Sequence, residues 1–255
     1  MSTAHPSAAP APTSSGRRRG RVPLSAAACL LGGLWGTGAA AAPVPLLNAS
    51  FESPALADGV ATLTVPSWTQ GGTGSNQSGV YNPTTAAFAG ASSGAGNLPA
   101  PAAGPQAAFM NTGGIGSATL TSATPLGAIL ASTKYTLTVA LGVRSDFPAA
   151  GVRLDNVYVE MTAGASGASL TGAYLAFDAN TLPAGSFKDY AVTFSTGASG
   201  NVIGQALSVD MGYQSTTNSG VMADNVRLDA SPVPEPATPA LLLVAGTALL
   251  RRRAR

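Results

Sequence analysis

The stretch from Lys134 to Val143, with the sequence KYTLTVALGV, decides the fold class of this chain. From Tyr135 onward a larger apolar side chain stands at every second position, with a small or polar one between each pair. A period of two is typical of a β-strand that has one face on a core and the other towards solvent. The stretch therefore predicts a half-buried strand in the middle of the chain.

Further segments of β character follow at similar spacing, with glycine-rich turns between them. The expected strands are 46–51, 60–65, 106–110, 117–121, 134–143, 152–161, 169–177, 188–195, 206–213 and 221–228. Many short strands without an amphipathic helix are typical of a β-sandwich. The segment from Gly71 to Pro105, rich in Gly, Ser, Ala and Asn, is expected to be a long surface excursion. We therefore predict one all-β domain over residues 42–231.

The N-terminal segment 1–41 is predicted to be a leader with a cleavable signal peptide. Four arginines between positions 17 and 21 form a basic region, the apolar segment 22–35 follows it, and small residues up to Ala41 offer a cleavage site. This order is typical of export through the Sec pathway. The only histidine and the only cysteine of the chain also lie in this leader.

The C-terminal segment 232–255 predicts a short transmembrane helix behind a proline-rich stop. The tripeptide PEP at 234–236 cannot be helical, because each proline removes a backbone donor and restricts the residue before it. Residues 237–250 carry no charge, and an arginine cluster follows them. A helix over 237–250 covers about 21 Å of a hydrocarbon core of about 30 Å. Because cationic residues favour the cytoplasmic side, the arginine cluster is expected there.

This C-terminal order resembles the PEP-CTERM sorting signal of Gram-negative bacteria. The residues that carry the resemblance are Val233, Pro234, Glu235, Pro236, Arg251, Arg252 and Arg253. The resemblance implies an exosortase-type membrane protease as a partner and transient anchoring in the inner membrane. It further implies delivery to the cell surface or extracellular matrix, and an association with exopolysaccharide and biofilm.

The charge and composition of the domain argue against several classes of function. Between Pro43 and Ala230 the chain has five basic and ten acidic residues, and an acidic domain without a basic patch is a poor nucleic-acid binder. Without histidine or cysteine, the domain cannot form a Ser-His-Asp or Cys-His arrangement or the usual zinc sites. We therefore predict no catalytic residues and no enzymatic activity. A carboxylate pair, as glycosidases use, is the remaining catalytic alternative.

The order of the β segments resembles a jelly roll of the galactose-binding-like class, the fold of many carbohydrate-binding modules. The motifs that carry the resemblance are LNASFE at 47–52, Trp68, YTLTV at 135–139 and DNVRL at 224–228. The resemblance implies that the opening and closing strands lie close together and share a structural Ca2+ ion. Its first ligands would be Glu52 and Asp224. The alternative is that both are strand-end residues that face water.

A glycan-binding module needs exposed aromatic rings on one face. Trp68, Tyr81 and Tyr174 are the candidates, because they stand in or beside loop-like sequence, while the alternative for each ring is a place in the core. The sequence therefore predicts a secreted, exosortase-sorted protein that binds or scaffolds exopolysaccharide without catalysis. A structural or adhesive biofilm protein and a carboxylate-dependent glycoside hydrolase are the alternatives.

Overall fold

The computed structural model describes residues 40–73, 77–88, 98–146, 156–171, 174–175, 182–215 and 218–233. Within these ranges no helix has the length and hydropathy of a membrane span. The signal peptide up to residue 39 and the sorting signal after Val233 lie outside the described residues. Both stay predictions, which the intact mass of the protein released from cells tests. Loss of the two ends is expected, and a released chain that keeps them contradicts export and sorting.

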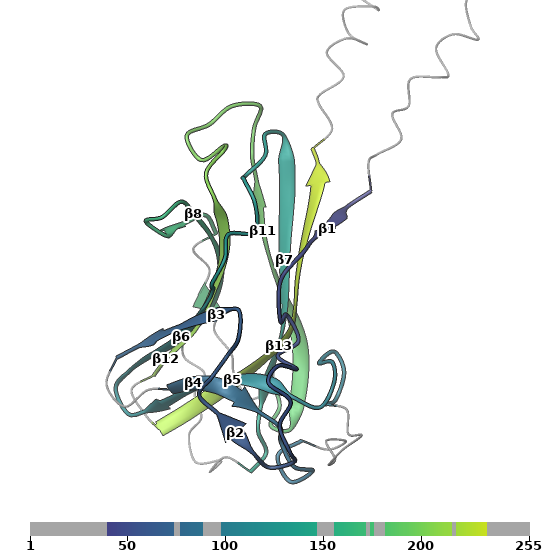
Figure 1. Cartoon of the computed structure of the whole chain (residues 1–255), viewed down its shortest axis with the longest axis vertical. Helices are drawn as coiled ribbons and strands as arrows, with labels where there is room; N and C mark the ends of the chain where they lie inside the picture. Colours follow the sequence, from purple (N-terminus) through teal and green to yellow (C-terminus); the bar gives the residue numbers. More distant parts are fainter. Residues whose placement is uncertain are drawn as a thin grey trace, which may run out of the picture. The chain divides into compact units, whose positions relative to one another are not determined.

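Two antiparallel sheets form the described part of the domain (Figure 1). The first sheet runs in the order β11 (Ser186–Ser195), β7 (Thr133–Val143), β13 (Asn218–Pro232), β5 (Ala107–Gly113), β4 (Gln77–Tyr81) and β2 (Ala61–Thr62), with β1 (Ala42–Val44) on β13. The second runs in the order β10 (Tyr174–Leu175), β8 (Asn156–Ala163), β12 (Leu207–Ser215), β6 (Gly116–Ser122) and β3 (Trp68–Gly72), with β9 (Ala168–Ser169) on β8. The predicted all-β sandwich of the jelly-roll type is confirmed.

The core lies between the two sheets and follows the period of two. On β7, Leu137, Val139 and Leu141 are fully buried and belong to a large apolar cluster that also includes Met211 and Tyr213 of β12. Burying each such side chain contributes about 1.5–3 kcal/mol. The alternation that the sequence showed in β7 therefore reports the face that packs on the second sheet.

The first expected strand, 46–51, is instead a turn. Asn48 and Phe51 have positive φ angles of 50° and 53°, which an extended strand does not contain. The Asn48 amide holds the turn closed, because its Nδ2 donates to Ser53 O at 2.9 Å and its Oδ1 accepts from Ser53 N at 3.1 Å. Asparagine tolerates the left-handed region better than most residues, so it overrides the apolar pattern here.

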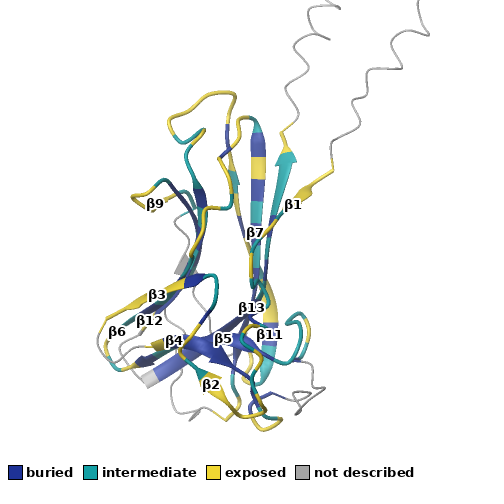
Figure 2. Cartoon of the chain, in the orientation of Figure 1, coloured by how far each residue is buried: buried dark blue, intermediate teal, exposed yellow. Residues whose placement is uncertain are grey.

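A second apolar cluster covers the outer face of the first sheet, on the side away from the main core. Its members come from five strands and from the connection between β4 and β5: Tyr81, Ala87, Phe88, Leu98, Ala107, Phe109, Ala140, Phe187 and Met222. Figure 2 shows β5, one of the strands beneath this cluster, mostly in the dark blue of buried residues. We call this set the aromatic cluster. It explains why burial on β7 no longer alternates from Ala140 onward.

The expected surface excursion from Gly71 to Pro105 is wrong in part. It contains β4, and Phe88 and Leu98 outside that strand are buried, with 0% and 3% of their surface exposed. These isolated side chains dock on the first sheet because its outer face offers apolar area there. The parts of this segment around Phe88 and Leu98 therefore pack on the sheet.

Candidate active site

The closing strand β13 places one carboxyl group beside the aromatic cluster. Met222 and Asp224 stand two positions apart on β13 and so share the outer face of the first sheet. Asp224 lies directly opposite Ala140 of β7, a member of the cluster. Its exposed fraction is 0%, and it is the only charged side chain among the described residues that is buried. A buried carboxyl without an ion pair is costly and therefore singles out this position.

A β-bulge after Asp224 fixes the carboxyl group. The register of β13 against β7 shifts between Asp224 and Arg227, and Asn225 within the shift has a positive φ of 46°. The Asn225 N–H donates to Asp224 Oδ1 at 2.6 Å, and its side-chain Nδ2 donates to Pro101 O at 2.8 Å. Bulges of this kind re-aim a side chain. Here the bulge ties Asp224 to the covering segment, which we define as residues 98–106.

The covering segment also brings a second carboxyl group to Asp224. The Ala103 N–H donates to Asp224 Oδ2 at 2.6 Å, and the Gln106 N–H donates to Glu52 Oε1 at 3.1 Å. Gly104 between them has a φ of 79°, and a Cβ there would overlap the Glu52 carboxylate. Only glycine fits both demands. The segment therefore holds Glu52 and Asp224 as a pair.

The environment of the pair keeps a proton on Asp224. Burial raises the pKa of Asp224 to about 8, and the negative charge of Glu52 adds to the shift, while the N–H groups of Ala103 and Asn225 oppose it. Burial also raises the pKa of Glu52, and the Gln106 N–H lowers it. A carboxyl group with a pKa near 8 is mostly protonated at neutral pH. Asp224 is therefore a proton donor held in a site without water contact.

Aromatic rings of the cluster cover two glycines on this sheet. Phe187 covers Gly142, whose missing side chain leaves room for the ring, and Phe109 covers Gly79 in the same way. Phe88 packs against Phe187 with ring centroids 4.8 Å apart. Such ring faces are electron-rich and attract positive charge. The site therefore combines a proton donor with surfaces that stabilise a cation.

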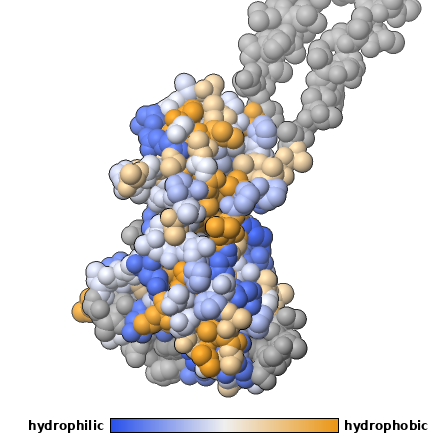
Figure 3. Space-filling view, viewed as in Figure 1, coloured by the Kyte–Doolittle hydropathy of each residue, from blue (hydrophilic) through white to orange (hydrophobic). Residues whose placement is uncertain are grey.

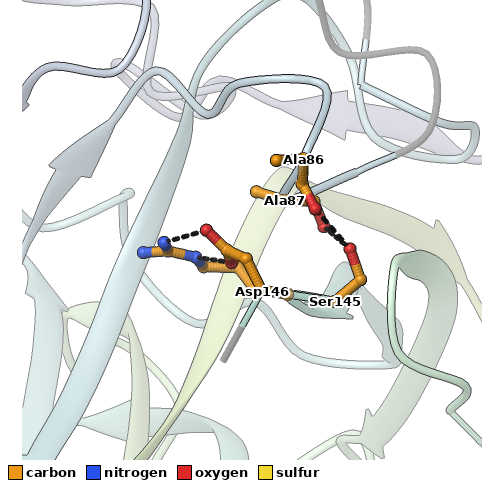
Figure 4. A network of polar contacts seen from close by, with 5 residues as sticks. Ala86, Ala87, Ser145 and Asp146 are labelled. Atoms are coloured by element: carbon orange, nitrogen blue, oxygen red, sulfur yellow. Dashed lines mark hydrogen bonds and ion pairs between the residues drawn. The ribbon is translucent and has the colours of Figure 1, made fainter. Parts of the chain in front are cut away.

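Three consecutive residues at the end of β7 close one edge of the aromatic cluster (Figure 4). The Arg144 guanidinium lies 4.6 Å above the centre of the Tyr81 ring. Asp146 holds it there, accepting from Nε at 2.8 Å and from Nη2 at 2.6 Å. Ser145 between them donates from Oγ to Ala87 O at 2.9 Å and from its N–H to the same oxygen, also at 2.9 Å. The strand end and the loop that carries Phe88 are thus fastened together.

A second carboxyl group with a raised pKa stands on the other sheet. Asp210 of β12 alternates with the core residues Val209 and Met211, so it faces outward from the second sheet. It accepts from Thr121 Oγ1 at 2.9 Å and lies opposite Glu160 of β8. Burial raises the pKa of Asp210 to about 6, and the charge of Glu160 adds to the shift. Asp210 is only partly buried and is mostly ionised at neutral pH.

The predicted calcium ligands Glu52 and Asp224 do lie together, and the ion itself stays a prediction. Three of the four carboxylate oxygens accept backbone N–H groups. In the part of the chain that the structure describes, no group of three or more His, Cys, Asp or Glu side chains is arranged to hold a metal. An ion at this pair would need carbonyl and water oxygens for most of its shell.

The expectation of exposed aromatic rings is wrong for Trp68 and Tyr81, which are 5% and 9% exposed. The Trp68 ring packs against Phe51 at 5.2 Å, and its Nε1 donates to Asn48 O at 3.2 Å, so it closes one end of the main core. Tyr81 lies in the aromatic cluster beneath Arg144. The side chain of Tyr174 lies outside the described residues. Neither described ring offers a free face to a glycan.

Comparison with known proteins gives one family and a set of similar solved structures. The HpiC1-like family model, described as HpiC1 cyclase, matches residues 42–229. The Stig cyclase Fisc from Fischerella sp. TAU, solved with (3Z)-3-(1-methyl-2-pyrrolidinylidene)-3H-indole, is 26% identical over 76% of this chain and 100% of its own, with a TM-score of 0.59. A cyclase from Fischerella sp. TAU, solved with 4-(1H-indol-3-yl)butan-2-one, is 25% identical over the same shares, with a TM-score of 0.57. No curated protein matches the chain.

These findings overturn two predictions. The chain was expected to bind or scaffold exopolysaccharide and to have no enzymatic activity, whereas the matching family and the similar structures are cyclases. The sequence argument failed because it looked for histidine, cysteine or a spaced carboxylate pair. A single carboxyl group that burial keeps protonated needs none of these, and its burial is not visible in the sequence.

Proposed function

Because the chain belongs to the HpiC1-like cyclase family, we propose that it closes a ring in a small, mostly apolar substrate, with Asp224 as the general acid. The observation that carries the proposal is the fully buried carboxyl group at the edge of the aromatic cluster, whose pKa burial raises to about 8. Two similar cyclases were solved with indole compounds, which supports a substrate that carries an indole or a related electron-rich ring.

The proposed reaction is an acid-catalysed isomerisation. Asp224 donates its proton to a carbon–carbon double bond of the substrate, and a carbocation forms. The π electrons of a second part of the substrate attack the cation, which makes the new ring bond. A proton then leaves the ring and returns to the Asp224 carboxylate, so the product has the same composition as the substrate. The rings of Phe88, Phe109 and Phe187 stabilise the cation, and their apolar surface keeps water from capturing it.

Access to Asp224 requires a movement of the covering segment. The carboxyl group has no exposed surface, and the N–H of Ala103 contacts it directly. The neighbouring strands carry the small side chains Ala107 and Ala140 beside Asp224, so little side-chain bulk surrounds the carboxyl group on the sheet. We therefore propose that substrate enters when residues 98–106 lift from the sheet. Lids of this kind shield reactive intermediates from water.

The test is a turnover assay on the purified protein with an indole that carries an unsaturated side chain. The expected product has the mass of the substrate and a new ring by NMR. Asp224→Asn keeps the shape of the side chain and removes the acid, so the rate should fall on the order of 10²–10⁴-fold. Asp210→Asn is the matched control and should keep the wild-type rate. An Asp224→Asn protein that turns over as the wild type does would contradict the proposal.

A further inference from the structure

The covering segment is a small loop that is closed on itself. The Leu98 N–H donates to Gly104 O at 2.9 Å, and the Ala102 N–H donates to Pro99 O at 3.2 Å. Apart from Leu98, the segment consists of Pro, Ala, Gly and Gln, so little apolar area is available to hold it down. Hydrogen bonds to the rest of the domain therefore decide how firmly the segment sits on the sheet.

The end of the segment at Gln106 is firmly fixed. The side chain is buried, and its Nε2 donates to Phe51 O and to Pro54 O, each at 3.0 Å. Its Oε1 accepts the N–H of Leu56. Pulling this amide out of its place is costly, because buried polar groups would lose their partners. We therefore expect the segment to move about Gln106.

Two hydrogen bonds join the middle of the segment to the sheet, and they differ in what they contact. The Ala103 N–H donates to Asp224 Oδ2, an oxygen of the proposed acid, at 2.6 Å. The Asn225 Nδ2 donates to Pro101 O at 2.8 Å. A substrate that receives the proton has to reach the Asp224 carboxyl group, so it competes with the Ala103 bond. The Asn225 bond involves no reacting atom and stays available while a substrate is bound.

The aromatic cluster is closed to solvent, so the same opening serves substrate and water. All members of the cluster are buried. On the face that Figure 3 shows, apolar side chains reach the surface in several separate places among polar ones. An apolar substrate therefore reaches the continuous apolar area of the cluster only when the covering segment lifts. Water that enters by the same movement competes with ring closure for the carbocation.

We infer that Asn225 is a specificity-determining residue, which holds the covering segment over the bound substrate and so favours ring closure over capture by water. The inference rests on the proposed cyclase reaction. In capture, the oxygen of a water molecule bonds to the cationic carbon and releases a proton to the Asp224 carboxylate. The ring does not close, and the product is the substrate plus one water molecule. The ratio of hydrated product to ring product therefore measures how well Asn225 holds the segment.

Asn225→Gly removes the hydrogen bond to Pro101 and keeps the bulge. Asn225 has a φ of 46°, a conformation that glycine adopts without strain. The backbone N–H of position 225, which donates to Asp224 Oδ1, is retained. The acid thus keeps this contact in the variant. Loss of one hydrogen bond should raise the open population of the segment on the order of 2–10-fold.

Ser132→Gly is the matched control. Ser132 has a φ of 47°, so the same residue enters the same backbone conformation. It stands directly before β7, outside the covering segment and the aromatic cluster. We expect this variant to keep both the opening of the segment and the product ratio of the wild type. Circular dichroism of each variant confirms that it is folded.

Hydrogen exchange, followed by NMR and corrected for the intrinsic rate of each amide, measures the opening in the free protein. In the wild type the Ala103 N–H should exchange faster than the Gln106 N–H, because opening breaks the first contact and leaves the second. Asn225→Gly should speed the exchange of Ala103 on the order of 2–10-fold and leave that of Gln106 unchanged. Equal exchange of the two amides in the wild type overturns the inference without any variant.

Turnover of an indole with an unsaturated side chain in oxygen-18-labelled water then gives the product ratio by mass spectrometry. Asn225→Gly should raise the share of labelled, hydrated product on the order of 2–10-fold, whereas a purely structural role would lower the yield of both products alike. If the wild type forms the ring product and Asn225→Gly keeps its product ratio, the inference is wrong and the proposed function stands. If the wild type forms no ring product, both are wrong.

Discussion

Asp224 and Asp210 occupy comparable places on the two sheets and differ in what lies above them. Each stands on one of the last two strands, β12 or β13, and faces outward from its sheet. The covering segment seals Asp224 completely, and burial raises its pKa to about 8. Asp210 keeps some contact with solvent, and its pKa rises only to about 6. Near neutral pH one carboxyl group is therefore an acid and the other a base.

The comparison shows that strand position alone does not make a catalytic acid. Both aspartates face outward from their sheets, and each has a carboxylate neighbour, Glu52 for Asp224 and Glu160 for Asp210. The difference is the degree of desolvation, which is the largest cause of both shifts. A segment that docks on the first sheet for apolar reasons thus sets the protonation state of Asp224.

The largest expected effect comes from disturbing the covering segment. Gly104→Ala adds a Cβ where the Glu52 carboxylate lies, at a φ of 79°. We expect overpacking to cost about 1–3 kcal/mol, beyond the strain of a left-handed alanine. Gly204→Ala is the control, because its φ of 83° imposes similar strain and nothing lies within 4 Å of the new Cβ. Urea unfolding measures both variants. If the free energy of unfolding falls equally in Gly104→Ala and Gly204→Ala, the contact between residue 104 and Glu52 is not tight.

The pH dependence of stability should separate the two aspartates. The pKa of folded Asp224 is raised, so the folded state binds the proton more tightly, and its contribution to stability falls as the pH rises from about 4 to about 8. The slope reaches about 1.4 kcal/mol per pH unit for one proton. Asp224→Asn should remove its share of the slope over the whole window, and Asp210→Asn should remove a smaller share that ends at about pH 6. Slopes that survive in Asp224→Asn above pH 6 would contradict the burial of this group.

A smaller effect is expected from calcium. An ion at Glu52 and Asp224 binds only the ionised carboxylates, so it competes with the catalytic proton. If the predicted site exists, calcium should raise the melting temperature above the value in chelator, more at pH 9 than at pH 6, and Asp224→Asn should abolish the rise. If the melting temperature with calcium equals the melting temperature with chelator at both pH values, the calcium site is ruled out and the proton is the occupant of the pair.

The sequence predicted those features that depend on local patterns. The alternation in β7 identified the sandwich and its inner face. The resemblance to a jelly roll, carried by motifs at the two ends of the domain, implied that Glu52 lies beside Asp224. The aromatic cluster was not predicted, because Phe88 and Leu98 stand alone among small residues. Several residues that they cluster with, such as Phe187 and Met222, are far away in the sequence. The missed signal was the alternation of Met222 and Asp224 on the outer face of a strand, which places a carboxyl group on an apolar surface.

The most direct test of this account is the titration of the Asp224 carboxyl carbon, followed by carbon-13 NMR and assigned by comparison with Asp224→Asn. The account predicts a midpoint near pH 8 in the free protein, about two pH units above the midpoint of Asp210 in the same spectra. A midpoint near 3.8, the ordinary value for an aspartate, would show that Asp224 is ionised at neutral pH and would contradict its role as the acid of a cyclase.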